Sequence, residues 1–296
     1  MAGRDSSSIA RLQRLLLRAA ALSFILLTVS CQARDVIKIS EFQGRYRAVP
    51  ESIVIVSWNA QKGQNPRFSS DLARVVIGQR PDFVFVQEAR ADLLDTKRIG
   101  GHFASSWRYP WPDGETIGLL TLSYVAPARV QPVPTKFKEF FVTAPKLSLV
   151  TEYLLTNGQR LLAVNVHLLA FERWGTSGIG SQLEDLQAIM EEHVGPIVLA
   201  GDFNTWSPKR LDLVQNVVDA LNLTEVTGFA PGRRTGDKQA SFLNWLFGID
   251  EELPLDRVYY RGFTHHSAKV LPYESSDHRA IQVTLVLEPP PSSSAN

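Results

Sequence analysis

A short apolar segment that ends in two polar residues constrains this chain more than any other stretch. Ile197–Ala200 lies between Pro196 and Gly201, and an apolar run of this kind is typical of a strand buried on both faces. Asp202 and Asn204 follow, and side chains two residues apart on an extended chain point the same way. In α/β proteins, polar groups at the end of a buried strand are a common place for chemistry. An Asx-rich turn would explain this segment equally well, so the interpretation depends on the rest of the chain.

The same arrangement recurs elsewhere. Three further predicted strands end in a side chain that can bind a cation or a phosphate group: Asn59 after 53–58, Glu88 after 83–86 and His167 after 160–166. Asp256 lies in another predicted strand, and Asp277 and His278 lie in a turn before the last strand, 280–287. Each residue alone has an ordinary explanation, as a turn residue, a helix start or a buried histidine with a partner. Burying so many polar groups is costly unless they pair or bind a cation, so the repetition predicts one shared site.

Strand and helix patterns alternate along the chain. Asn157-Gly158 separates two apolar runs, 146–155 and 160–166, which is a strong signal for a β-hairpin. The spacing of apolar residues predicts three helices: 69–79, 178–193 and 208–221. Three prolines are expected to form a surface connection: Pro127, Pro132 and Pro134. Hairpins together with strand–helix units predict an α/β fold of mixed sheets covered by helices.

The distribution of charge limits the kind of partner. The 296-residue chain has a formal net charge of +1, and four arginines and one aspartate give residues 1–31 a charge of +3, which leaves −2 on the remainder. A body so close to neutral lacks the broad basic field of a dedicated DNA-binding protein, although a local basic groove remains compatible with it. The length predicts one large domain, 51–288, after a linker at 32–50 and before a disordered tail at 289–296.

The first 31 residues have the pattern of a targeting segment. A basic region ends at Arg18, and the uncharged stretch 19–30 is shorter than a membrane-spanning helix and typical of a signal peptide. The single cysteine, Cys31, follows directly, in a sequence similar to a loose bacterial lipobox. Lipidation of Cys31, cleavage nearby and an uncleaved anchor stay open, and an N-terminal helix of the fold is the less favoured alternative. Each of the first three predicts a protein of the bacterial cell envelope, anchored at the membrane or exported.

Six short motifs resemble, in type and in order, those of one superfamily: Ser57-Trp-Asn59, Val86-Gln-Glu88, Asn165-Val-His167, Gly201-Asp-Phe-Asn204, Leu255-Asp256 and Ser276-Asp-His278. This is the endonuclease/exonuclease/phosphatase superfamily, which includes DNase I-like nucleases, apurinic endonucleases, inositol-polyphosphate phosphatases and bacterial sphingomyelinases. The resemblance spans about residues 53–287, and the chain looks most like little-characterised bacterial members. It implies a four-layer α/β sandwich, in which two mixed β-sheets are flanked by helices.

The resemblance also implies a metal site. Its ligands would be Asn59, Glu88 and Asp277, and oxygen ligands without cysteine suit Mg²⁺ or Mn²⁺ more than Zn²⁺. Some nuclease members carry an acid two residues after the first of these positions. Gln61 stands there in this chain, which counts against a second metal, and Lys62 follows it as either a phosphate ligand or a solvated side chain.

The implied catalytic residues have distinct roles. Asp202 would orient or deprotonate the attacking water, and Asn204 would hold that water or a phosphoryl oxygen. His278 would contact the scissile phosphate as an imidazolium, because the Asp256 carboxylate that holds its ring stabilises the charge. His167 would bind phosphate or assist the leaving oxygen.

These expectations describe a divalent-metal-dependent phosphoesterase that hydrolyses a phosphodiester by direct attack of water, without a covalent enzyme intermediate. A nuclease is favoured, because the basic segment 232–238 lies beside the aromatic insert 242–247, a pairing that serves backbone contact and base stacking. A sphingomyelinase-like phospholipid phosphodiesterase and a catalytically silent envelope binding protein are the alternatives. The expected partners are nucleic acid or a phospholipid headgroup as substrate, and the membrane through the N-terminal segment, with the protein itself a monomer.

Overall fold

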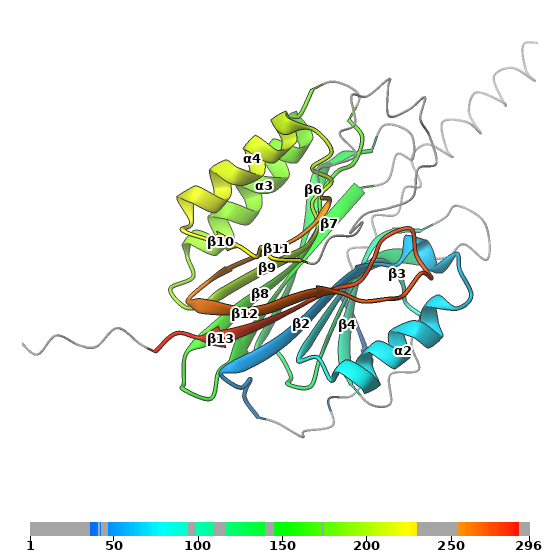
Figure 1. Ribbon diagram of the computed structural model, residues 1–296. Coiled ribbons are helices and arrows are strands. Elements are labelled where there is room, and N and C mark those ends of the chain that lie inside the picture. Colours follow the sequence, from blue (N-terminus) through cyan, green and yellow to red (C-terminus); the bar gives the residue numbers. More distant parts are fainter. Residues whose placement is uncertain are drawn as a thin grey trace, which may run out of the picture.

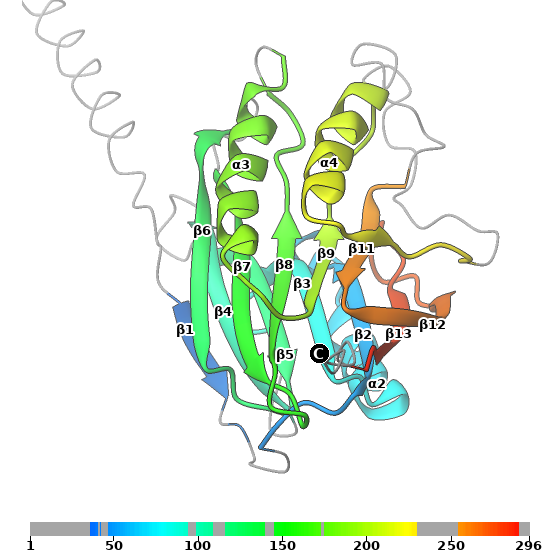
Figure 2. The same cartoon turned by 90° about the vertical axis from the view of Figure 1, so that its left-hand side faces the viewer.

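The computed structural model describes residues 36–40, 42, 47–93, 99–108, 116–139, 145–172, 175–229 and 254–289. In this part of the chain, two mixed β-sheets pack face to face and helices cover their outer faces (Figure 1). Helix α2 (Phe68–Gln79) covers one sheet, and α3 (Ser177–Glu191) and α4 (Pro208–Ala220) lie side by side on the other (Figure 2). The four-layer α/β sandwich expected from the sequence is confirmed.

The larger sheet has seven strands in the order β1-β4-β5-β3-β2-β13-β12. Their bounds are β1 Val36–Ser40, β2 Ser52–Asn59, β3 Phe83–Arg90, β4 Gly100–Arg108, β5 Thr116–Ser123, β12 Phe263–Val270 and β13 Ile281–Leu287. Strands β2 and β3 run parallel, and the other neighbouring strands are antiparallel. A 3₁₀ turn, η1 (Gln61–Gly63), follows β2.

The smaller sheet has six strands in the order β10-β11-β9-β8-β7-β6. Their bounds are β6 Arg129–Lys138, β7 Pro145–Leu154, β8 Arg160–His167, β9 Ile197–Asp202, β10 Thr224–Glu225 and β11 Asp256–Arg261. Strands β7 and β8 form the predicted Asn-Gly hairpin, and β8 and β9 form the parallel pair of this sheet. Each sheet therefore has one parallel pair near its middle.

Three apolar layers stabilise the sandwich. Along β2, Ile53 and Ile55 pack between the two sheets, whereas Val56 and Trp58 pack in the layer under α2. A third layer packs the six-stranded sheet against α3 and α4. Since both faces of the central strands are buried, these strands have nearly continuous apolar sequences.

The proline-rich segment is a strand, which corrects the expectation of a surface connection there. Pro132 and Pro134 lie inside β6, which pairs with β7 on one side and forms the edge of its sheet. Proline cannot donate a backbone hydrogen bond, but an edge strand has N–H groups that face away from the sheet, so proline is tolerated there.

Five strands are absent from the expected elements: β1, β4, β6, β10 and β12. Strand β1 lies within the segment expected to be a linker, and it pairs with β4, whose glycine- and serine-rich sequence has low strand propensity. Strand β12 follows β11 and pairs with β13. Pairing with neighbouring strands, rather than the local sequence, decides the structure of these segments.

Several predicted features lie outside the described residues. They are the N-terminal segment with Cys31, the basic and aromatic segments at 232–238 and 242–247, and the tail from 290 to 296. Among the residues that the structure describes, no helix has the length and apolar character needed to span a membrane.

Candidate active site

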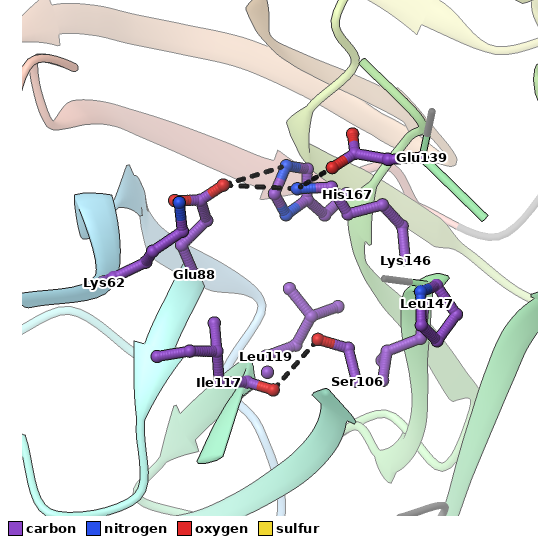
Figure 3. Close-up of a pocket in the computed structure, with 11 residues that line it drawn as sticks. Lys62, Glu88, Ser106, Ile117, Leu119, Glu139, Lys146, Leu147 and His167 are labelled. Carbon is purple, nitrogen blue, oxygen red and sulfur yellow. Dashed lines mark hydrogen bonds and ion pairs between the residues drawn. The ribbon is translucent and has the colours of Figure 1, made fainter. Parts of the chain in front are cut away.

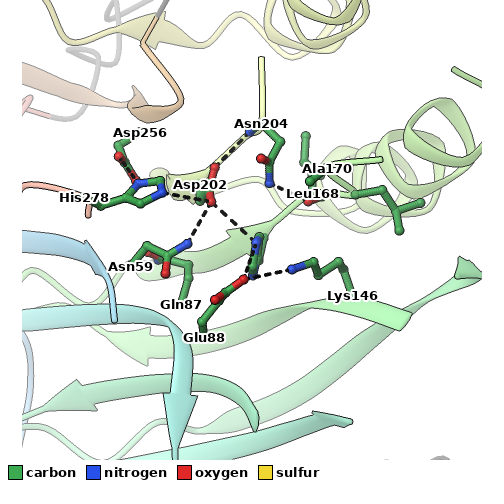
Figure 4. Close-up of polar contacts among 12 residues, drawn as sticks. Asn59, Gln87, Glu88, Lys146, Leu168, Ala170, Asp202, Asn204, Asp256 and His278 are labelled. Atoms are coloured by element: carbon green, nitrogen blue, oxygen red, sulfur yellow. Dashed lines mark hydrogen bonds and ion pairs between the residues drawn. The ribbon is translucent and has the colours of Figure 1, made fainter. Parts of the chain in front are cut away.

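The inner faces of four strands change from apolar to polar toward one end of the sandwich. Inward positions lie two residues apart: 53, 55, 57 and 59 in β2; 83, 85 and 87 in β3; 161, 163, 165 and 167 in β8; and 198, 200 and 202 in β9. The first positions of each series are apolar and the last are polar. The central strands of each sheet are parallel, so their polar ends lie side by side within that sheet. The packing of the two sheets then places Asn59 and Glu88 opposite Asp202 (Figure 4).

Asp202 lies at the centre of these contacts. Its Oδ2 accepts a 2.9 Å hydrogen bond from Nδ2 of Asn59 and lies 3.5 Å from Nε2 of His167. Its Oδ1 accepts a 3.0 Å bond from the backbone N–H of Asn204. Burial raises the pKa of Asp202 to about 6, although the positive charge of His278 opposes the shift. This carboxylate is therefore ionised at neutral pH but is more basic than an exposed aspartate.

A glycine before Asp202 permits the close approach of β8 and β9. Gly201 has φ +150°, and a Cβ atom there would lie 2.0 Å from the carbonyl oxygen of Val166. The parallel register of the two strands then places His167 directly beside Asp202. The glycine thus lets β8 and β9 pack closely enough to place the Asp202 carboxylate next to His167, at the point where β9 ends.

His278 and Asp256 form a buried pair next to Asp202. Asp256 begins β11 and lies opposite Asp202 in the antiparallel register. Nδ1 of His278 donates a 2.7 Å hydrogen bond to Oδ2 of Asp256, and Nε2 lies 4.0 Å from Oδ2 of Asp202. Burial acts to lower the pKa of His278, but the carboxylates of Asp256, Asp202 and Asp277 raise it to about 10. The ring is therefore an imidazolium at neutral pH.

Two hydrogen bonds attach the segment that carries His278 to β2. Oγ of Ser276 donates to the backbone oxygen of Asn59 at 2.6 Å, and Nε1 of Trp58 donates to the backbone oxygen of His278 at 2.9 Å. Trp58 itself is fully buried. The histidine is thus fixed to the larger sheet, although its aspartate partner belongs to the smaller one.

A β-bulge directs Glu88 toward the opposite sheet. In a regular strand Glu88 would point outward, because Val86 before it packs under α2 and Gln87 points inward. The register of β3 shifts between Val86 and Ala89, and Glu88 has the left-handed φ of 47°. Bulges of this kind re-aim a side chain at functional sites. Here the carboxylate reaches side chains of the smaller sheet.

Glu88 is surrounded by cationic groups. Its Oε1 accepts a 3.2 Å hydrogen bond from Nζ of Lys146, and its Oε2 lies 3.8 Å from Nζ of Lys62. Burial acts to raise the pKa of Glu88, but the lysine ammonium groups and His167 outweigh it and lower the pKa to about 2. Glu88 is therefore ionised over the whole physiological range.

His167 lies between the two carboxylates. Its Nε2 is 3.9 Å from Oε1 of Glu88 and 3.5 Å from Oδ2 of Asp202. Burial, together with the ammonium of Lys146, lowers the pKa of His167 well below its ordinary value. The ring is therefore neutral at pH 7, so it serves as a hydrogen-bonding group rather than a fixed charge. The backbone oxygen of His167 accepts a 3.0 Å bond from Nε2 of Gln182 in α3, which ties this strand end to the helix layer.

Asn204 is held by buried groups beneath the site. Its Nδ2 donates to the backbone oxygen of Leu168 at 2.9 Å, and its own backbone oxygen accepts a 2.7 Å bond from Nε of Arg210 in α4. The Arg210 guanidinium also donates to Leu169 and lies over the ring of Trp206. Arg210 thus binds the two loops that follow β8 and β9 to each other.

Left-handed backbone conformations gather around the site. Among the non-glycine residues with positive φ in the described chain, four lie here: Gln61 (47°), Lys62 (59°), Glu88 (47°) and Asn204 (49°). Such conformations are strained for side chains with a Cβ atom, and they persist where the surrounding structure enforces them. Their concentration here is independent support for a functional site.

A pocket opens beside Glu88 and is lined by residues of both sheets (Figure 3). Charged and polar side chains form one wall: Lys62, Glu88, Glu139, Lys146 and His167. The opposite wall is mainly apolar and includes Ile117, Leu119 and Leu147. The site therefore extends from Asp202 past Glu88 into a cavity with one charged wall.

Glu88 and Asn59 provide oxygen donors that suit a divalent cation. The described residues hold no group of three or more His, Cys, Asp or Glu side chains that could bind a metal. Mg²⁺, however, is usually bound by one or two carboxylates and completes its shell with water and substrate oxygens. The ionised Glu88 and the oxygen of Asn59, which accepts a 2.9 Å bond from the Gln61 N–H and has a second lone pair, fit that requirement.

Asp277, the third expected ligand, has other partners. Its Oδ1 accepts a 3.3 Å hydrogen bond from Oγ of Ser276, and its N–H donates to Oε1 of Gln61 at 3.3 Å. Within the described part of the chain, no hydrogen bond or ion pair joins it to Glu88. The structure thus brings the other expected site residues into one connected group and leaves Asp277 at its margin.

Sequence reasoning missed four residues that shape the site: Gln87, Glu139, Lys146 and Arg210. For Gln87 a signal was present, because it continues the inward series of β3. Lys146 lies in an arm of the predicted hairpin, where a lysine is ordinarily a solvated residue. No local pattern distinguishes it from such a residue, since its partners come from β3 and from the end of β6.

Comparisons with known proteins give a matching family model, related sequences and similar folds. The model of the Endonuclease/Exonuclease/phosphatase family matches residues 56–278. A UPF0294 protein of Vibrio vulnificus (strain CMCP6) is 33% identical over 238 residues, which cover 80% of this chain and 78% of the relative. An endonuclease/exonuclease/phosphatase family protein from Leptotrichia buccalis C-1013-b has a similar structure, with a TM-score of 0.60 and 13% identity over 79% of this chain and 99% of its own. An AP endonuclease from Leishmania major has a TM-score of 0.53 and 12% identity over 86% of this chain and 97% of its own, and both structural likenesses concern the fold alone.

Proposed function

The chain belongs to the Endonuclease/Exonuclease/phosphatase family, and from this premise we propose that it is a divalent-metal-dependent phosphoesterase that hydrolyses a phosphodiester by direct attack of water. One observation carries the proposal: a buried carboxylate with a pKa near 6, Asp202, lies 4.0 Å from an imidazolium, His278, that a second carboxylate holds in place. A base and a fixed positive charge side by side suit attack of water on a phosphoryl group.

Asp202 is the proposed general base. A base works best when its pKa lies near the working pH, and burial raises this carboxylate toward that range. Its hydrogen bonds from Asn59 and Asn204 fix its orientation, so the carboxylate can orient a water or take its proton. The imidazolium of His278 supplies positive charge for the phosphoryl oxygens, on which negative charge grows during attack. The neutral His167, on the other side of Asp202, supplies a hydrogen bond to a phosphoryl or leaving oxygen.

Glu88 and Asn59 are the residues that would hold the cation, Mg²⁺ or Mn²⁺. A cation bound there adds positive charge beside the phosphoryl and leaving oxygens. The low pKa of Glu88 supports this assignment, because a ligand carboxylate must be deprotonated.

Nucleic acid is the proposed substrate class. Support comes from the sequence, which places a basic segment at 232–238 beside an aromatic insert at 242–247, outside the described residues. Lys62, which lines the pocket and is partly exposed, adds a cation within the described part of the chain. We also propose that the N-terminal segment attaches the protein to the bacterial envelope through a lipidated Cys31 or an uncleaved anchor, which mass spectrometry of the membrane-extracted protein would distinguish.

A substrate panel on the purified full-length protein tests the function. We expect hydrolysis of bis(p-nitrophenyl) phosphate with Mg²⁺ or Mn²⁺ and none with EDTA. Asp202→Asn should lower kcat by at least about a hundredfold while the protein remains folded. Asp185→Asn is the matched control, because Asp185 forms a surface ion pair with Lys136 away from the site. Equal rates for Asp202→Asn and the wild type would mean that the base has been misassigned.

Plasmid DNA, RNA and sphingomyelin vesicles then separate the substrate classes. Cleavage of nucleic acid that weakens steeply with salt supports a nuclease, because each phosphate contact releases counterions. Release of phosphocholine with nucleic acid untouched supports the sphingomyelinase-like alternative. Tight binding of a phosphodiester without turnover of any substrate supports a silent binding protein.

A further inference from the structure

Lys146 is a buried cation shared by two carboxylates. Its Nζ lies 3.2 Å from Oε1 of Glu88 and 3.5 Å from Oε2 of Glu139, and only 12% of its side chain is exposed. A buried ammonium is costly unless it is paired, and here two partners compensate it from different elements. Glu88 comes from the bulge of β3, and Glu139 follows β6 directly.

Glu139 is fixed independently of Lys146. Its other carboxylate oxygen, Oε1, accepts a 2.8 Å hydrogen bond from the backbone N–H of Ala170. The side chain is 6% exposed, so it has little freedom to leave this place. Glu139 therefore remains available as a partner for Lys146 whether or not Glu88 is engaged elsewhere.

A cation at Glu88 and the ammonium of Lys146 would compete for the same carboxylate. Both are positive and both are attracted by Glu88, so a bound cation would weaken the hold of Glu88 on Lys146. Lys62 is farther away, 3.8 Å from Oε2, and its side chain is 33% exposed. Of the two lysines, Lys146 is therefore the nearer and more buried competitor, and Glu139 is a second carboxylate that can keep its ammonium paired (Figure 3).

We propose that Lys146 is a positioning residue, an internal counter-ion that holds Glu88 in place before a divalent cation binds and that pairs with Glu139 once the cation has taken Glu88. The proposal rests on the metal dependence proposed above and adds a residue that sets the affinity of the site. It predicts opposite effects of removing the charge of Lys146 and that of Glu139. Loss of the Lys146 ammonium strengthens cation binding, whereas loss of the Glu139 carboxylate weakens it.

The test is calorimetric titration of Mn²⁺ into the full-length protein and its variants, without substrate. Lys146→Met keeps the length of the side chain and should bind Mn²⁺ at least about tenfold more tightly, within the range of ordinary couplings between two sites. Glu139→Gln keeps an oxygen for the Ala170 N–H but removes the charge, so Lys146 stays on Glu88 and the affinity should fall several-fold. Lys146→Arg retains the charge and should stay close to the wild type. Lys136→Met is the control, because Lys136 pairs with Asp185 at the surface.

The outcomes separate the proposals. If the wild type binds neither Mn²⁺ nor Mg²⁺, the metal dependence is wrong and this inference fails with it. If the wild type binds Mn²⁺ but Lys146→Met binds it equally or more weakly, the inference alone is wrong. Unchanged Mn²⁺ affinity with a raised KM for a phosphodiester would assign Lys146 to substrate binding instead, which also overturns the inference. If Lys146→Met does not fold, Glu139→Gln with unchanged Mn²⁺ affinity overturns it independently.

Discussion

Gln87 donates a 2.8 Å hydrogen bond from Nε2 to Oδ1 of Asn165 across the interface between the two sheets. Gln87 directly precedes Glu88 in β3, and Asn165 lies two residues before His167 in β8. Both side chains are fully buried, and Nδ2 of Asn165 donates in turn to the backbone oxygen of Leu120 at 3.1 Å. The bond therefore links the strand that carries Glu88 to the strand that carries His167.

Substitution of Gln87 should affect stability and activity together. Gln87→Leu leaves the Oδ1 of Asn165 buried without this donor, which should lower the free energy of unfolding by about 1–3 kcal/mol. We expect kcat to fall as well, because this bond would no longer hold β3 and β8, which carry Glu88 and His167, at a fixed separation. Urea denaturation and steady-state kinetics measure both effects.

A double variant and a surface control sharpen this prediction. Gln87→Leu combined with Asn165→Leu should recover part of the stability, because removing both partners leaves fewer unpaired polar groups. Gln187→Leu, in an exposed pair with Glu191 on α3, should change stability by less than about 0.5 kcal/mol. A Gln87→Leu variant as stable as the wild type would show that the hydrogen bond makes no net contribution.

Much of the site could be predicted because it follows strand periodicity. Asn59, His167 and Asp202 occupy inward positions at the ends of buried strands, and both the position and the chemistry are visible in the sequence. Glu88 was expected near them, but its orientation depends on a bulge and a left-handed residue that no local pattern reveals. The sequence thus predicts which strand ends meet but not how each side chain is turned.

Other features depend on contacts between distant segments. Lys146 and Glu139 become site residues only when β7 and the end of β6 lie beside β3. Similarly, Pro132 and Pro134 belong to a strand only because β6 is at the edge of its sheet. The local sequence favours a loop there, and the tertiary pairing overrides it.

The pH dependence of hydrolysis should reflect Asp202 and His278. Asp202 must be ionised to act as the base, so kcat/KM should rise with pH through about 6. His278 must keep its proton, so kcat/KM should fall as the pH approaches about 10. The expected profile is a broad plateau between these limits, measured with bis(p-nitrophenyl) phosphate at saturating cation.

Asp256→Asn provides the diagnostic variant for this profile. Without the carboxylate of Asp256, the imidazolium of His278 loses its nearest counter-charge, so the alkaline limb should move to lower pH. The acidic limb should remain within about one pH unit of its place, because Asp202 is retained. An alkaline limb that is identical in the variant and the wild type would exclude His278 as its origin.

Removal of the Glu88 charge should weaken cation binding without unfolding the protein. Glu88→Gln keeps the shape of the side chain but removes the anion that the cation needs, so Mn²⁺ affinity and kcat should both fall by at least about tenfold. Calorimetric titration and kinetics over a range of Mn²⁺ concentrations measure these losses. Glu274→Gln, which removes an exposed partner of Arg279, should leave both quantities unchanged. Full activity of Glu88→Gln in the presence of EDTA would contradict the metal assignment.

The Asp256–His278 pair should also make folding stability depend on pH in a defined window. Folding raises the pKa of His278 from its ordinary 6.5 to about 10, so the folded protein holds this proton more tightly than the unfolded chain does. The stability from this proton is fully present below pH 6.5 and is lost progressively as the pH rises toward 10. Folding also raises the pKa of Asp202, from its ordinary 3.8 to about 6. The stability from that proton is likewise lost as the pH rises, but between pH 3.8 and about 6, so the effects of the two residues fall in different pH ranges.

The measurement compares the wild type with Asp256→Asn by urea denaturation at pH 6, 7.5 and 9. The variant lacks the carboxylate that contributes most to the raised pKa of His278, so the wild type should be more stable at pH 6, and the difference between the two should shrink at pH 9. Titrating groups remote from Asp256 cancel in this difference, because both proteins contain them, and Asp202, whose pKa depends on Asp256, is largely ionised at pH 7.5 and 9. A constant difference across the three pH values would show that the neutral contacts of Asp256, rather than the charged pair, stabilise this corner of the site.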